Sequence, residues 1–340
     1  MRFDFDVYGT ALEPHPDQRN TLRYLGDVAQ LAERHGFEGL LSFYNHRNLD
    51  PWMVAATLLH TTTTLVPLVA VQPYAVGPLT TAKMVHTLSS LHGRRVDVNL
   101  ITGAAKEELV QIGDTIDHDQ RYARAMEHMQ VVSSLLGSNE PFNHDGAHYR
   151  FRGLRADAAL DPQLHPRVFV AGASEAGRKA AFAVGDVAVT HPEPVQLFAE
   201  GFLASHAAAV RAAARQPPRV GIRVGLVARP TSEEAWEFAR TQYVADRYTR
   251  LKMSMRKKSD SVWSRQMAAL ATEGDVYDEV YWTGAYRSDQ GFAPLLVGDY
   301  EQVAQYLAEY LTLGVSTVLL AAVYSEEDFR HVDRVLTLLR

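Results

Sequence analysis

The stretch Arg95-Val96-Asp97-Val98-Asn99-Leu100-Ile101-Thr102-Gly103 is the part of the sequence that decides the fold. Its apolar and polar residues alternate and end at Thr102 and Gly103, which predicts a β-strand that runs into a polar loop. After this loop, residues 113–122 (Gly-Asp-Thr-Ile-Asp-His-Asp-Gln-Arg-Tyr) open a long helix. A strand, a polar loop and a helix are the repeating unit of an α/β barrel, in which chemistry takes place at the carboxyl ends of the strands.

The same alternation continues along the whole chain. Each predicted strand is followed by a predicted helix, and the strands are residues 3–9, 37–43, 64–71, 95–101, 167–171, 186–190, 219–227 and 316–323. Eight such units predict an α/β fold, a (β/α)8 TIM barrel. The alternative is an open doubly wound sheet, but the first strand–helix turn lacks the Gly-x-Gly-x-x-Gly pattern of that fold.

Two stretches interrupt this alternation and predict insertions after strands 4 and 7. Residues 137–166 are rich in Gly, Asn, His and Pro and indicate an excursion from the barrel. Residues 250–295 are long, polar and partly basic, which is typical of a mobile lid or a binding loop. Neither stretch separates two cores, so we expect one barrel domain over residues 1–340.

Composition narrows the classes of function. The formal net charge is -6, which argues against a nucleic-acid-binding protein. The sequence has no cysteine, which excludes disulfides, thiolate nucleophiles and cysteine-ligated metals. No apolar run reaches the length of a membrane span, and the first residues do not resemble a signal peptide. We therefore expect a cytoplasmic protein without membrane or nucleic-acid partners.

The residues at the predicted strand ends favour a bound cofactor over acid–base or metal chemistry. They include few carboxylates, and their histidines are isolated, so no metal site is predicted. Residues 169–175 (Phe-Val-Ala-Gly-Ala-Ser-Glu) read as a strand, a small-residue turn and a helix start. Backbone N–H groups and the Ser174 hydroxyl there could bind a phosphate. The same residues could equally form only a tight turn and a helix cap.

The pattern Asn-Leu-x-Thr-Gly (99–103) followed by Asp-His-x-x-Arg-Tyr (117–122) resembles the bacterial luciferase-like flavin-dependent monooxygenases, and most closely their alkanesulfonate monooxygenase branch. The resemblance implies that FMN is the cofactor. It implies that the phosphate contacts the Gly172–Ser174 turn, His118 and Tyr122, that the ring and ribityl chain border Asn99 and Thr102, and that Val71 and Gln72 lie under the ring, often beside a non-prolyl cis peptide. The implied cofactor-binding residues are Val71, Gln72, Asn99, Thr102, His118, Tyr122, Gly172, Ala173 and Ser174.

The substrate-binding residues implied by the resemblance depart from the alkanesulfonate enzymes. Asn48 stands where those enzymes have a cysteine, His191 stands for a tryptophan, Gly225 for a histidine, and Ala322 for a tyrosine. We therefore expect a substrate other than a simple alkanesulfonate. The candidate catalytic residues are His191, Asn48, Arg223 and Arg287. The two arginines suggest an anionic substrate, although Arg223 could instead form a structural ion pair.

The activity implied by the resemblance is that of a two-component monooxygenase. It would use reduced FMN and O2 to oxygenate or oxidatively cleave a small anionic organic molecule. A separate NAD(P)H-dependent flavin reductase would supply the reduced FMN, and the protein would form a homodimer or homotetramer. Two alternatives remain on the same barrel: a deazaflavin-dependent hydride-transfer oxidoreductase and a non-catalytic flavin-binding protein.

Overall fold

The computed structural model describes residues 2–11, 21–103, 106–213, 216–245, 261–288, 291 and 293–340. It divides into two compact units. Unit 1 comprises Met1–Thr10, Arg34–Phe37 and Val189–Arg340, and unit 2 comprises Ala11–Glu33 and Glu38–Ala188. Each unit is described by itself.

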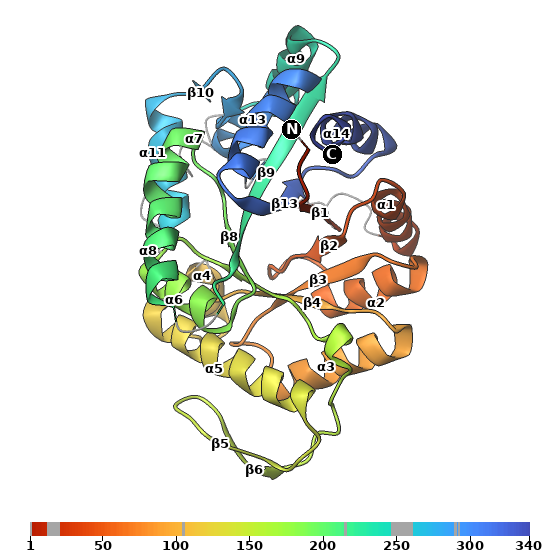
Figure 1. The fold of residues 1–340 in the computed structure, drawn as a ribbon, viewed down its shortest axis with the longest axis vertical. Helices are drawn as coiled ribbons and strands as arrows, with labels where there is room; N and C mark the ends of the chain where they lie inside the picture. The colour runs from red at the N-terminus through yellow and green to blue at the C-terminus, as the bar shows by residue number, and fades with distance from the viewer. Residues whose placement is uncertain are drawn as a thin grey trace. The chain divides into compact units, whose positions relative to one another are not determined.

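Unit 2 is built on a parallel sheet. Neighbouring strands are β2 (Gly39–Ser42), β3 (Val66–Val71), β4 (Asp97–Leu100) and β7 (Val168–Ala171). Every residue of β2 and β3 is buried, as expected for strands covered on both faces. The helices between the strands are α1 (Leu22–Arg34), α2 (Pro51–Thr61), α3 (Pro78–His92), α4 (Lys106–Gln111), α5 (His118–Gly137) and α6 (Glu175–Val184), and most are labelled in Figure 1.

Capping residues explain where the helices of unit 2 begin. The Asp50 side chain accepts hydrogen bonds from the N–H groups of Trp52 and Met53, and Pro51 occupies the first helical position of α2. Asp117 caps α5 in the same way through the N–H of Gln120. These caps fix the carboxyl-end loops that precede each helix.

Unit 1 contains a second group of strands. Here β1 (Asp6–Thr10) is parallel to β13 (Val315–Ala321), and β13 is parallel to β9 (Arg219–Arg229). The carboxyl-terminal half of β9 also pairs with β12 (Leu295–Asp299), to which β11 (Tyr281–Trp282) and then β10 (Val276–Tyr277) are added antiparallel. The helices are α7 (Val195–Phe198), the π-helix η2 (Ala199–Leu203), α8 (Ala204–Ala212), α9 (Ser232–Gln242), α11 (Val262–Glu273), α12 (Gly284–Arg287), α13 (Tyr300–Thr312) and α14 (Glu326–Leu339).

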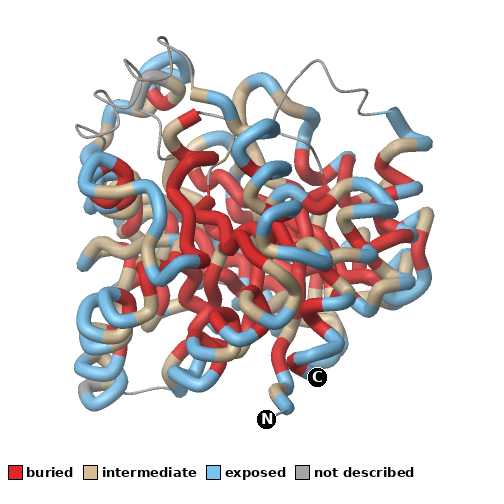
Figure 2. The backbone as a smooth tube through the Cα atoms, turned by 90° about the horizontal axis from the view of Figure 1, so that it is seen from above, coloured by how far each residue is buried: buried red, intermediate tan, exposed pale blue. Residues whose placement is uncertain are grey.

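The fold class is the predicted one. Strands β1, β2, β3, β4, β7, β8 (Val187–Thr190), β9 and β13 alternate with helices in chain order, which is the (β/α)8 barrel fold. Figure 2 shows buried residues in continuous runs along strands, which are covered on both faces, and at intervals along helices, which bury one face.

The structure differs from the sequence-based expectations at several points. The helical segment after β8 is α7, η2 and α8 in succession rather than one helix, and the short helix α4 was not predicted. The described residues contain no cis peptide bond, so the one suggested beside Val71 and Gln72 is absent. No helix in the described part of the chain has the length and apolar character needed to span a membrane.

The two predicted insertions contain secondary structure. The 137–166 excursion forms an antiparallel hairpin of β5 (Phe142–Asp145) and β6 (Arg150–Leu154) and the 3₁₀ turn η1 (Pro162–Leu164). Figure 1 draws this hairpin below α5. The predicted lid, residues 250–295, holds α11, β10, β11, α12 and the start of β12, while 250–260 lie outside the described residues.

Candidate active site

In unit 2, the turn between β7 and α6 consists of the small residues Gly172, Ala173 and Ser174. Ser174 caps α6, and its hydroxyl accepts a hydrogen bond from the N–H of Gly177 at 3.0 Å. Gly172 has φ +152°, and a Cβ at this position would overlap Tyr122 Oη and lie 3.3 Å from Gly177 Cα. Only glycine therefore fits between the tyrosine and the first turn of the helix.

Tyr122 connects this turn to the loop after β4. Its hydroxyl donates to the carbonyl oxygen of Ala171 at 3.1 Å and is within hydrogen-bonding reach of the Thr102 and Ser174 side chains. Burial raises the pKa of Tyr122, so the phenol stays protonated. The ring of His118 packs edge-on against Tyr122, with centroids 5.1 Å apart.

The predicted ring-binding residues lie on the neighbouring strands of the same sheet. Val71 ends β3, and the adjacent Gln72 is buried, with its amide donating to the Ala70 carbonyl oxygen at 3.0 Å. Asn99 on β4 is level with Ala70 on β3 and with Phe169 on β7. The register therefore brings Asn99 to the same carboxyl edge as the Gly172–Ser174 turn.

Unit 2 contributes two further polar residues to the candidate site, Asn48 and Arg178. Asn48 is partly buried, and its Nδ2 is buried without a hydrogen-bond partner among the described residues. Arg178, which was not predicted, donates from Nη1 to the Ala173 carbonyl oxygen at 2.8 Å. It places a positive charge beside the first turn of α6. A basic residue four positions after the capping serine was the available sequence signal.

In unit 1, His191 stacks on a residue that was not predicted. The His191 ring lies on the indole of Trp263, with centroids 3.7 Å apart and an interplanar angle of 24°. Trp263 begins α11 and packs edge-on against Tyr286 at 5.4 Å. The sequence signal for it was weak, because Trp263 is one of two tryptophans, with Trp282, in the polar 250–295 stretch.

Buried nitrogen atoms in this region lack partners. Nε2 of His191, Nε of Arg223 and Nε1 of Trp263 have no hydrogen-bond partner in the part of the chain that the structure describes. Burial, together with the charge of Arg223, lowers the pKa of His191 well below its usual value. His191 is therefore neutral at pH 7 and is suited to hydrogen bonding rather than to carrying a charge.

The structure explains two other substrate-side positions. A Cβ at Gly225 would overlap the Leu295 side chain, so no histidine fits there once β12 pairs with β9. Arg287 lies on α12 and forms an ion pair with Asp275, so its charge is already neutralised. Among the candidate arginines, only the Arg223 side chain contributes a buried unpaired nitrogen.

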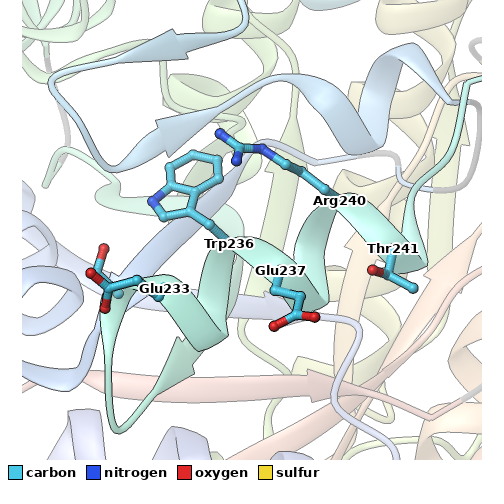
Figure 3. A pocket seen from close by; sticks show the side chains of 6 residues that line it. Glu233, Trp236, Glu237, Arg240 and Thr241 are labelled. Atoms are coloured by element: carbon cyan, nitrogen blue, oxygen red, sulfur yellow. The ribbon is translucent and has the colours of Figure 1, made fainter.

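A separate groove lies along α9 and contains none of the predicted residues. Its volume is about 570 Å³, and Figure 3 shows its lining side chains on one helix. The Arg240 guanidinium lies over the Trp236 ring, 5.1 Å from its centroid. The lining residues are Ser232, Glu233, Trp236, Glu237, Arg240 and Thr241.

Known proteins match this chain over most of its length. The family model of luciferase-like monooxygenases matches residues 3–317. The 4-(γ-L-glutamylamino)butanoyl-[BtrI acyl-carrier protein] monooxygenase BtrO of Niallia circulans is 42% identical over 310 residues, which cover 91% of this chain and 89% of BtrO.

Solved structures share the fold at lower identity. EDTA monooxygenase (EmoA) from Chelativorans sp. BNC1 has a TM-score of 0.79 at 19% identity, covering 99% of this chain and 93% of its own. Riboflavin lyase (RcaE), solved with modified FMN and riboflavin, has a TM-score of 0.77 at 22% identity, covering 100% and 92%. The family model and the 42% identical relative show that this chain belongs to the luciferase-like monooxygenase family.

Proposed function

We propose that this luciferase-like monooxygenase uses reduced FMN and O2 to oxygenate or oxidatively cleave a small organic substrate that carries a carboxylate or similar anion. The observation that carries the proposal is the cradle of Gly172, Ser174, Tyr122 and Thr102 in unit 2. The proposal includes a separate NAD(P)H-dependent flavin reductase, a homodimer or homotetramer, and a cytoplasmic location.

The cradle fits the phosphate of FMN. The amino end of α6, a ten-residue helix, offers N–H groups and a partial positive charge. The Ser174 hydroxyl adds a neutral donor, Tyr122 holds the turn through the Ala171 carbonyl oxygen, and Arg178 adds a full positive charge beside the same turn. We assign His118, Ala173 and Gly172 to the wall of this phosphate site.

The adjacent strand ends fit the ribityl chain and the ring. Asn99 and Thr102 offer an amide and a hydroxyl, while Val71 and Gln72 form a buried, close-packed floor. When bound, reduced FMN supplies the electrons with which O2 is activated. These residues of the chain then have to orient the ring and keep water away from it.

The three unpartnered nitrogens in unit 1 favour an anionic substrate. A carboxylate can accept hydrogen bonds from neutral His191, from the Trp263 indole and from Arg223. The name of BtrO describes an acyl group with a γ-glutamyl end, and such an end carries a free carboxylate. We propose that Arg223 binds the substrate anion, that His191 and Asn48 orient the reacting group, and that Arg287 acts only from the periphery.

Cofactor titrations and oxygen uptake test the proposal. The purified protein should bind FMN, in oxidised or reduced form, and consume O2 when a flavin reductase, NADH and a carboxylate-bearing acyl substrate are present. Parallel titration with a reduced deazaflavin separates the alternative hydride-transfer enzyme. Binding of the deazaflavin without FMN binding, or substrate turnover without O2, would reject the proposal.

A further inference from the structure

A chain of side-chain hydrogen bonds reaches both ends of the turn after β3. Tyr149 Oη lies 3.2 Å from the carbonyl oxygen of Pro73 and 3.3 Å from Nδ1 of His128. On the other side, Nε2 of His128 lies 3.1 Å from the Thr81 hydroxyl, which donates to the carbonyl oxygen of Gly77 at 3.2 Å. His128 and Thr81 have no exposed surface.

The turn held by these bonds, Gln72–Gly77, follows directly on Val71. The N–H groups of Ala75 and Val76 both donate to the Gln72 carbonyl oxygen, at 2.9 and 3.0 Å. Movement of the turn therefore moves Gln72. The hydrogen bonds to the turn go to the backbone carbonyl oxygens of Pro73 and Gly77, so they do not depend on the side chains of the turn.

The excursion hairpin delivers Tyr149 to this position. The Glu127 carboxylate of α5 accepts hydrogen bonds from the N–H groups of His148 and Tyr149, at 3.0 and 2.8 Å, and contacts Nε2 of His144 at 3.0 Å. Burial acts to raise the pKa of Glu127, but these donors outweigh it and lower the pKa. The backbone of Tyr149 is thus fixed by an ionised carboxylate.

While His128 is neutral, Tyr149, His128 and Thr81 have one donor proton each, so three protons are available for the four contacts. With the proton on Nε2, His128 donates to Thr81, and Tyr149 has one proton for both Pro73 and Nδ1. With the proton on Nδ1, His128 donates to Tyr149, and Thr81 has one proton for both Gly77 and Nε2. Each tautomer satisfies three of the four contacts. The tautomer therefore decides whether Tyr149 or Thr81 shares its proton between two acceptors, while the Gly77 carbonyl oxygen also accepts from the Thr81 N–H at 3.0 Å.

We propose that Tyr149 and His128 are positioning residues for the Gln72–Gly77 turn and, through Gln72, for the flavin ring. This inference rests on the proposed function, since Gln72 is there assigned to the floor of the ring site. It gives the 137–166 excursion a role: the hairpin supplies the hydroxyl that holds the turn.

FMN titrations of the full-length protein test this role, with quenching of flavin fluorescence as the signal and urea unfolding as the stability measure. Tyr149→Phe removes only the hydroxyl and should weaken FMN binding by about 3- to 10-fold, the loss of one hydrogen bond. Thr81→Val should act in the same direction from the other end. Tyr300→Phe is the matched control, because it likewise removes a tyrosine hydroxyl that bonds to Nδ1 of a histidine, His331 at 2.8 Å, and leaves the contacts of the turn and of Glu127 intact.

The outcomes separate this inference from the proposed function. The inference holds if Tyr149→Phe and Thr81→Val raise the FMN dissociation constant while Tyr300→Phe leaves it unchanged. Unchanged FMN binding in both hydroxyl variants would overturn the inference and leave the proposed function standing. Absence of FMN binding by the wild type would overturn both.

Discussion

Replacing Gly172 by alanine should damage the cradle in a way that can be measured both as stability and as cofactor affinity. The added Cβ would overlap Tyr122 Oη and press on Gly177 Cα at 3.3 Å, and φ +152° is unfavourable for alanine. Overpacking costs about 1–3 kcal/mol and the backbone conformation about 1–2 kcal/mol. We therefore expect Gly172→Ala to lower the free energy of unfolding by about 2–5 kcal/mol.

The cofactor effect follows from the displaced tyrosine. To avoid the new methyl group, the Tyr122 hydroxyl must leave the Ala171 carbonyl oxygen, to which it donates at 3.1 Å. The displaced hydroxyl also disturbs the Ser174 side chain within its reach, and loss of this donor to the phosphate costs about 1.5–3 kcal/mol, so FMN should bind about 10- to 100-fold more weakly.

Urea unfolding and FMN titration of the two alanine variants give the assay. Gly137→Ala is the control: this exposed glycine ends α5, has nothing within 4 Å of an added Cβ, and should be neutral or up to about 1 kcal/mol more stable. The reasoning about the cradle is refuted if Gly172→Ala unfolds at the wild-type urea concentration and binds FMN with wild-type affinity.

Three further predictions use side chains outside the cradle. Asp97→Asn should cost about 3 kcal/mol in urea unfolding, because the fully buried Asp97 accepts from Arg95 Nε at 2.6 Å. Burial acts to raise the pKa of Glu33, but donors from residues 63–65 outweigh it and lower the pKa to about 2. The resulting stability is present above about pH 4.3, the unfolded value, and is lost as pH falls toward 2. Glu33→Gln should therefore be less stable than the wild type at pH 7, and unfolding measured from pH 7 to 2.5 should show the difference shrinking; a constant difference would contradict the linkage. Arg223→Met should raise the substrate KM by at least about 10-fold, the loss of a charged hydrogen bond, with FMN affinity unchanged; an unchanged KM would remove Arg223 from the substrate site.

The sequence could predict the barrel because its evidence is local. The continuous apolar run over 64–71 and the Asp50-Pro51 cap each specify one element, and the structure has β3 and α2 there. It could also predict which edge carries the cofactor candidates, because the carboxyl ends of parallel strands meet.

The parts that could not be predicted depend on contacts between distant residues. The pairing of β12 with β9 buries Leu295 against Gly225, and five residues of β12 next to a polar stretch give no periodic signal. Trp263 becomes part of the candidate substrate region only because its ring stacks on His191, 72 positions earlier in the chain. The partner of Arg287, Asp275, is likewise visible only once α12 is placed.

The candidate cofactor residues and the candidate substrate residues differ in how much their polar groups contribute to folding stability. This difference affects how easily the family can change its substrate. Tyr122 donates to the Ala171 carbonyl oxygen, Ser174 accepts from the Gly177 N–H, and Gly172 leaves no room for a side chain, so their replacement costs stability as well as affinity. Nε2 of His191, Nε of Arg223 and Nε1 of Trp263 have no hydrogen-bond partner among the described residues, so these three atoms add no hydrogen bond to the folded state. Burying an unpaired polar group is destabilising. Arg223→Met should therefore unfold at a higher urea concentration than the wild type while losing substrate binding, the opposite sign to Gly172→Ala. Polar groups that oppose folding in this way can be exchanged for those that suit another substrate without unfolding the barrel.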